Sequence, residues 1–162
     1  MKRKSYIKQN KNLYENAKLL LPSMFDEVMS HQERVLNHPR LKDELHKMRI
    51  AGKPLRYAME IFEPILKKPY ASCFKQIKDL IELMGTIHDH DVTIVKLQDF
   101  LHELQLFNKQ CENKKEHVSL NGLRKLIYQQ KSQRTALFTE MCDTITSWKK
   151  ENFREKLFTP VK

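Results

Sequence analysis

Apolar residues recur along almost the whole chain at the three- and four-residue spacing of one helix face. The first such stretch runs from Asn12 to Leu36, and similar stretches run from Lys42 to Leu66, from Ser72 to about Phe107 and from about Val118 to Lys150. The polar residues from Asn108 to Glu116 predict a loop. Long helices with short links predict an all-α fold, with an up-down four-helix bundle of long antiparallel helices as its architecture.

Several residues mark where these helices start and stop. Pro22 either kinks the first helix or marks its effective start. The triplet His38-Pro39-Arg40 predicts a turn, because the residue before a proline avoids the α region. Ser72 is a good N-cap residue for the third helix. Gly85 and the run His88-Asp89-His90-Asp91 interrupt that helix, which predicts two helices placed end to end.

Length and composition favour one compact helical domain. The chain has 162 residues and 40% hydrophobic residues, enough for a single core. It has only 3 Gly, which disfavours β-rich folds and Gly-rich nucleotide-binding loops. The domain division that we predict is a basic N-terminal arm over residues 1–11, the bundle over 12–150 and a basic C-terminal tail over 151–162.

Cysteines and targeting signals point to the cytoplasm. Cys73, Cys111 and Cys142 are widely spaced and form no CxxC pair, so reduced thiols are expected instead of a disulfide framework or a zinc knuckle. The basic N-terminus is not followed by an apolar segment typical of a signal peptide, and no apolar run is long enough to span a membrane.

The net charge of +10 is unevenly distributed. Residues 1–71 carry +7, residues 72–107 carry −3 and residues 108–162 carry +6. The positive charge therefore belongs to the first, second and last helices and to the two termini. Part of it, in the N-terminal arm, is typical of a solvated segment.

The second helix holds a stripe of cations. His46, Arg49, Lys53 and Arg56 lie at i, i+3, i+7 and i+10, within one arc about 80° wide that borders the apolar face. Like charges at this spacing repel each other. One interpretation is an anion site, in which guanidinium groups bind phosphate oxygens. The other is a row of salt bridges between helices, with Asp89 and Asp91 as partners. Glu60 and the carboxylates of another helix are the nearest candidates to relieve the repulsion.

The last helix repeats this pattern. Arg124, Lys131 and Arg134 have the same i, i+7, i+10 spacing, and Arg134 falls inside the apolar arc. A buried arginine needs an anion beside it, either a carboxylate of the acidic third segment or an external ligand. Lys75 and Lys78, near the start of the third segment, are placed to join the same surface.

The HDHD run invites a metal-site interpretation. On a helix, residues two apart point in nearly opposite directions, so His88 and His90 cannot chelate one ion unless the helix breaks. No further motif supports a metal hydrolase, and no other catalytic arrangement stands out. We therefore predict no metal site and assign Asp89 and Asp91 a structural role, in which one of them caps the helix that restarts after Gly85.

Two of these segments together resemble the CHAD domain family, the conserved histidine α-helical domain. LHKMRIAGKPLRYAMEIF, from Leu45 to Phe62, is similar to that family's H-x-x-R-x-x-x-K-x-x-R-Y helix, and KDLIELMGTIHDHDV, from Lys78 to Val92, is similar to the segment that follows it. The resemblance implies an all-helical domain whose basic surface binds inorganic polyphosphate, often alongside polyphosphate granules or a CYTH triphosphatase domain.

The resemblance also implies roles for individual residues. His46, Arg49, Lys53, Arg56 and Lys78 would contact phosphate, and Tyr57 would support them. A full CHAD domain repeats the basic motif twice, whereas this chain has one clear copy, so it resembles a half-length version. A homodimer would rebuild the two-fold surface.

The resulting prediction is non-enzymatic binding of inorganic polyphosphate, without cofactor and without membrane association. The alternatives are a general nucleic-acid-binding protein, driven by the same net charge, and a metal-dependent phosphohydrolase. The hydrolase would use His46, His88, Asp89 and Asp91.

Overall fold

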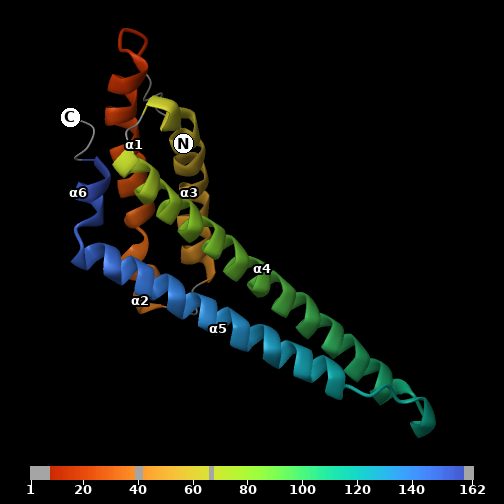
Figure 1. Cartoon of the computed structure of the whole chain (residues 1–162). Coiled ribbons are helices and arrows are strands. Elements are labelled where there is room, and N and C mark those ends of the chain that lie inside the picture. Colours follow the sequence, from red (N-terminus) through yellow and green to blue (C-terminus); the bar gives the residue numbers. More distant parts are fainter. Residues whose placement is uncertain (1–7, 39–41, 66–67, 159–162) are drawn as a thin grey trace. The chain divides into compact units, whose positions relative to one another are not determined.

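The computed structural model describes residues 8–38, 42–65 and 68–158, and every regular element within them is helical. In chain order the elements are α1 (Leu13–Met29), α2 (Gln32–Asn37), α3 (Lys42–Phe62), the 3₁₀ turn η1 (Glu63–Ile65), α4 (Lys68–Gln110), the 3₁₀ turn η2 (Lys114–Glu116), α5 (Asn121–Lys150) and α6 (Phe153–Phe158). Figure 1 shows these elements. The all-α fold is confirmed, and the four-helix up-down bundle stays a prediction.

The chain divides into two compact units. The first comprises Met1–Gly85 and Met141–Lys162, and the second comprises Thr86–Glu140. Helices α4 and α5 each contribute one part to each unit.

The first predicted helix is two helices in the structure. Asn12 and Glu15 form a capping box at the start of α1, and Pro22 lies inside the helix, so Pro22 does not mark its start. Helix α1 ends at Met29, where the Ser30 hydroxyl donates to the Glu27 carbonyl over 2.7 Å. The chain resumes as α2 after this break.

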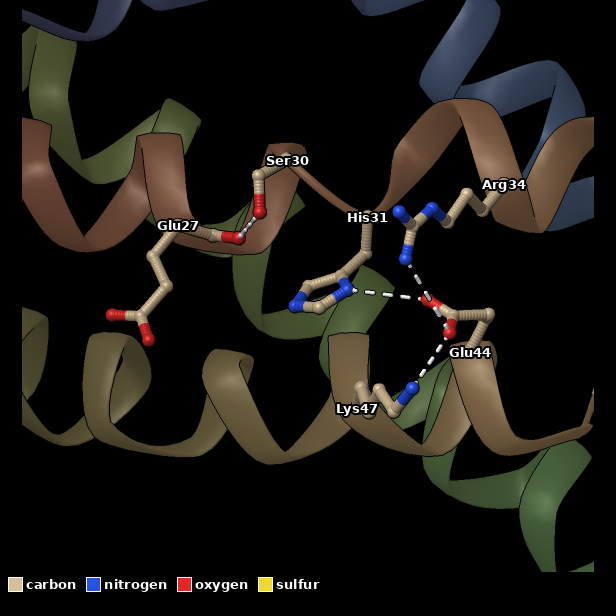
Figure 2. Close-up of polar contacts among 6 residues, drawn as sticks. All are labelled: Glu27, Ser30, His31, Arg34, Glu44 and Lys47. Atoms are coloured by element: carbon tan, nitrogen blue, oxygen red, sulfur yellow. Dashed lines mark hydrogen bonds and ion pairs between the residues drawn. The ribbon is translucent and has the colours of Figure 1, made fainter. Parts of the chain in front are cut away.

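A buried carboxylate joins α2 to α3. Glu44 Oε1 lies 2.7 Å from Lys47 Nζ and 3.9 Å from Arg34 Nη1, and its Oε2 lies 3.5 Å from His31 Nδ1 (Figure 2). Chiefly through its hydrogen bond with Lys47, this environment lowers the pKa of Glu44. The cluster explains why the chain can break at Ser30 and still keep α2 against α3.

Helices α1, α3, α6 and the adjoining ends of α4 and α5 build the core of the first unit. Its fully buried side chains come from all of these elements: Leu21, Leu45, Met48, Leu55, Met59, Tyr70, Ile77, Met84, Met141, Ile145 and Leu157. This core fixes the orientation of α3 and leaves only one of its faces, with its borders, available to solvent.

Helix α4 is continuous from Lys68 to Gln110, which corrects three predictions. Ser72 lies within it and is not an N-cap, and neither Gly85 nor the HDHD run interrupts it. Asp89 and Asp91 therefore cap nothing, since an interior position has no free helix-terminal N–H groups. A glycine costs a helix only about 1 kcal/mol relative to alanine. The buried apolar face that continues on both sides of Gly85 outweighs that cost.

The segment predicted as a tail contains a packed helix. In α6, Phe153 and Leu157 are buried. Trp148 stacks on Phe153 with ring centroids 4.1 Å apart, and Phe25 of α1 lies 6.1 Å from the same ring. The Arg154 guanidinium donates two hydrogen bonds to the carboxylate of Asp26, over 2.6 and 2.7 Å. Residues 159–162 of the predicted tail, and residues 1–7 of the predicted N-terminal arm, lie outside the described residues.

The second unit is a helical hairpin. Residues 86–110 of α4 pair with residues 121–140 of α5 (Figure 1). At its tip, the Asn108 side chain makes two hydrogen bonds of 2.8 Å with the backbone of Val118. Helix α4 runs to Gln110, so the connection between the two helices covers residues 111–120, includes η2 and starts later than the predicted loop.

Candidate functional site

The cationic stripe predicted on the second helix is present on α3. His46 and Lys53 are exposed, and Arg49 and Arg56 are partly buried at the edge of the core. Apolar neighbours of the stripe, Met48 and Leu55 among them, are buried, so the stripe borders the core as predicted. Helix α3 thus holds two guanidinium groups in restricted positions and presents Lys53 between them.

Helix α4 lies directly against this stripe. A Cβ atom built on Gly52 of α3 would lie 3.0 Å from Cγ1 of Ile81 and 3.6 Å from Cε of Met84. A Cβ atom built on Gly85 of α4 would lie 3.9 Å from Nε of Arg49. The two glycines therefore allow the helices to approach closely, and Gly85 leaves space beside the Arg49 guanidinium.

Arg56 is held by carboxylates from both helices. Its Nε lies 3.0 Å from Glu60 Oε1, and its Nη1 lies 3.2 Å from Glu82 Oε1. The hydrogen bond to Glu60 is the main reason why the pKa of Arg56 is raised, so this guanidinium stays charged. The salt-bridge interpretation is thus correct for Arg56, but with Glu60 and Glu82 as partners instead of Asp89 and Asp91.

Antiparallel packing extends the stripe onto α4. Arg49 lies beside Gly85, and Arg56, which comes later on α3, contacts Glu82, which comes earlier on α4. The two helices therefore run in opposite directions. Lys78 is one helical turn, about 6 Å, before Glu82, and this places it near the level of Arg56. Lys75, one turn earlier, is exposed and forms an ion pair with Asp79, with Nζ and Oδ2 2.8 Å apart.

Three of these cations have no carboxylate partner among the described residues. Within the described part of the chain, Arg49, Lys53 and Lys78 make no ion pair, whereas Arg56 and Lys75 do. We call Arg49, Lys53 and Lys78 the unpaired cations. Arg49 lies at the junction of α3 and α4, and the helical spacing places Lys53 and Lys78 near it. Their uncompensated charge is what an anionic ligand requires.

Tyr57 is 59% exposed on α3. No hydrogen bond of its hydroxyl is present in the described residues. Its predicted role in supporting phosphate contacts stays a prediction.

The cations of the last helix belong to the second unit. Arg134 pairs with Asp91 of α4, with Nε 3.3 Å from Oδ1 and Nη2 3.4 Å from Oδ2, and its guanidinium lies 4.8 Å from the ring centroid of Phe138. Both charged side chains are largely buried. The anion that this arginine needs is therefore a carboxylate of the third segment. Arg124 and Lys131 are exposed on α5.

The HDHD run lies on one uninterrupted helix. Nδ1 of His90 is 2.7 Å from Oε1 of Gln130 on α5, while Nδ1 of His88 is 3.6 Å from Oδ1 of Asp89. In the described ranges, no three His, Cys, Asp or Glu side chains gather in a way that could hold a metal ion. The helices of those ranges include none that is long and apolar enough to cross a membrane.

Sequence reasoning missed Glu82, Gly52 and the contact between Gly85 and Arg49. Glu82 lies four residues after Lys78, but only the packing of α4 against α3 brings it to Arg56. Gly52 is a glycine inside a strongly amphipathic helix, and such a residue indicates close helix contact.

The fold and the site define a helical protein with a cationic junction between two helices. The family model of the CHAD domain matches residues 3–98, which is more than half of the chain. The chain belongs to the CHAD domain family, and the extent of the match is consistent with a single CHAD domain. The matched range contains the α3 stripe, Lys75 and Lys78, and it ends before α5 begins. Comparison with curated proteins and with solved structures finds no significant match.

Proposed function

We propose that the protein binds inorganic polyphosphate at the junction of α3 and α4, without catalysing a reaction. The CHAD domain is associated in general with polyphosphate binding. The observation that carries the proposal for this chain is the set of unpaired cations, Arg49, Lys53 and Lys78, on two packed helices.

The spacing of the cations suits a linear polyanion. Arg49, Lys53 and Arg56 follow one another every three or four residues, which is about 4.5 to 6 Å along the axis of α3. Successive phosphate groups of one chain can therefore meet successive cations. Arg49 offers a planar, multiply donating group for phosphate oxygens, and Lys53 adds a point charge.

The carboxylates at the junction, Glu60 and Glu82, balance the charge of Arg56 in this proposal. Glu60 and Glu82 neutralise Arg56 in the unliganded protein. They thereby reduce the repulsion between Arg56 and the neighbouring cations. We assign the primary phosphate contacts to Arg49, Lys53 and Lys78, and a supporting electrostatic role to Arg56, His46 and Lys75.

The test is a titration with polyphosphate of defined length at several salt concentrations. Each phosphate neutralised by a cation releases counterions, so affinity falls steeply as salt rises. The variant Arg49→Gln/Lys53→Gln/Lys78→Gln should bind at least tenfold more weakly. With a contribution of about 0.7 per contact, its slope of log affinity against log salt should be shallower by about 2.

The matched control removes the same charge elsewhere in the first unit. Lys18 on α1 and Lys149 and Lys150 on α5 are exposed, and Lys18→Gln/Lys149→Gln/Lys150→Gln also lowers the net charge by three. The control should keep most of the affinity. Equal losses in the two variants would show that only net charge matters, and would contradict a site at the junction.

Two further measurements separate the alternatives. Competition with RNA at equal phosphate concentration should leave polyphosphate bound; preferential binding of RNA would favour a nucleic-acid-binding function. A phosphate-release assay with and without divalent metal should show no turnover.

We place this function in the cytoplasm, at polyphosphate granules, with a CYTH triphosphatase-type protein as a further partner.

A further inference from the structure

The outer face of α4 in the second unit has an unusual composition. Lys96, Phe100, Glu103 and Phe107 lie at i, i+4, i+7 and i+11, within an arc about 60° wide. We call these four residues the outer α4 stripe. They lie on the side of α4 away from Ile87 and Ile94, its buried residues in the hairpin.

Two phenylalanines of the outer α4 stripe are unusually exposed. Phe100 and Phe107 are each 49% exposed. An aromatic side chain has an area of about 150 to 250 Å², so each ring leaves on the order of 100 Å² in water. Exposed apolar patches rimmed by polar residues mark interaction surfaces, and Lys96 and Glu103 adjoin the two rings on the same arc.

The two charges of the outer α4 stripe are without ion-pair partners in the part of the chain that the structure describes. Lys96 and Glu103 are exposed, and neither makes an ion pair with any described residue. They are seven residues apart, about 10 Å along the helix, and therefore cannot pair with each other. The stripe thus alternates a cation, a ring, an anion and a ring.

The part of this pattern around Phe100 is complementary to itself. If two α4 helices pack antiparallel about a two-fold axis beside Phe100, Phe100 meets its own copy. Lys96 of each chain then meets Glu103 of the other, because Lys96 lies four residues before Phe100 and Glu103 lies three residues after it. An isologous interface requires this kind of reciprocal match.

The distribution of charge between the units also favours a second copy. Residues 86–140 contain eight Lys and Arg against seven Asp and Glu, so the second unit carries +1 and the first carries the remaining +9. Self-association through the second unit brings together surfaces of a unit that carries almost no net charge. A polyanion is disfavoured on the stripe, because Glu103 lies between its two phenylalanines.

We propose that the outer α4 stripe is a self-association surface, occupied by the same stripe of a second copy of this chain. The part of α4 in the second unit is about 37 Å long. A single helix pair of this length buries an area at the low end of specific interfaces. The expected dimer is accordingly reversible, with a dissociation constant in the micromolar range.

Sedimentation equilibrium over a range of protein concentrations tests the proposal. Wild type should shift from monomer to dimer as its concentration rises. Lys96→Glu alone and Glu103→Lys alone should each weaken the dimer at least tenfold, because each places like charges together twice. An equimolar mixture of the two variants should form a heterodimer, since both contacts are then attractive.

A matched pair of apolar variants locates the surface. Phe100→Ser/Phe107→Ser should remain monomeric. Val95→Ser/Leu106→Ser is the control, because Val95 and Leu106 are each 44% exposed on a different side of α4. Circular dichroism should show unchanged helicity in all variants. A monomeric wild type, a mixture that does not associate, or a control that dissociates while the phenylalanine variant does not would overturn the proposal.

Discussion

The close approach of α3 and α4 can be tested with two glycine-to-alanine substitutions of opposite expected sign. Alanine is favoured over glycine inside a helix by about 1 kcal/mol. At Gly85 the added methyl group meets only Arg49 Nε, at 3.9 Å, an ordinary contact. Gly85→Ala should therefore raise the free energy of unfolding by about 0.5 to 1 kcal/mol.

At Gly52 the same methyl group has little room. It would lie 3.0 Å from Cγ1 of Ile81, an atom close to the backbone of a buried side chain, so Ile81 must give way by a few tenths of an ångström in a packed core. Overpacking of this kind costs about 1 to 3 kcal/mol. Subtracting the gain in helix propensity leaves a net destabilisation of about 1 kcal/mol for Gly52→Ala.

Urea unfolding measures both effects in the same assay. The two variants should differ by about 2 kcal/mol in the free energy of unfolding, with unchanged dependence on urea concentration. If Gly52→Ala is as stable as Gly85→Ala, the helices do not pack at Gly52 as described, and the junction that positions Arg49 and Lys78 is also wrong.

Two further predictions concern buried polar groups. The pKa of Glu44 is lowered, so its interactions stabilise the fold above about pH 4.5, the ordinary value, and are lost as the pH falls toward the lowered value. Glu44→Gln should therefore unfold at lower urea than wild type at pH 7, and this difference should shrink below pH 4.5; a constant difference would contradict the ion pairs. Burial raises the pKa of Tyr70, whose hydroxyl has no hydrogen-bond partner in the described residues. Tyr70→Phe should raise stability by about 1 kcal/mol in thermal unfolding, whereas a loss would reveal a partner for the hydroxyl.

Periodicity predicted the existence of the helices well, because an apolar face must repeat with the period of the helix that buries it. It was less informative about interruptions. Gly85 and the HDHD run look like a break in the sequence, yet packing on both sides keeps α4 continuous. The break at Ser30 has no such signal, and the ion pairs that link α2 to α3 after it come from Glu44, a residue of another helix.

The candidate site was predictable only along single helices. The arc shared by Arg49, Lys53 and Arg56 follows from their spacing, since one helix fixes their relative directions. Arg56 pairs with Glu60 on the same helix, but its second partner, Glu82 of α4, depends on the register between two helices. The same limit applies to Arg134, where spacing indicated an anion and only tertiary structure identified Asp91.

The segment of the short helix α6 has a helical apolar pattern, but its charged residues led to the prediction of a basic tail. Phe153, Leu157 and Phe158 recur at helical spacing inside a segment rich in charged residues. Their partner Phe25 lies more than a hundred residues away, so sequence alone could not show that they pack.

The stacked Trp148 gives the protein a built-in optical reporter. It is the only tryptophan in the chain, and its ring is buried against Phe153 in the first unit. Its fluorescence therefore follows the docking of α6, while circular dichroism follows every helix, including those of the hairpin. If the two signals change at different urea concentrations, the units unfold separately; coincident curves mean that the continuous α4 and α5 make them one cooperative body.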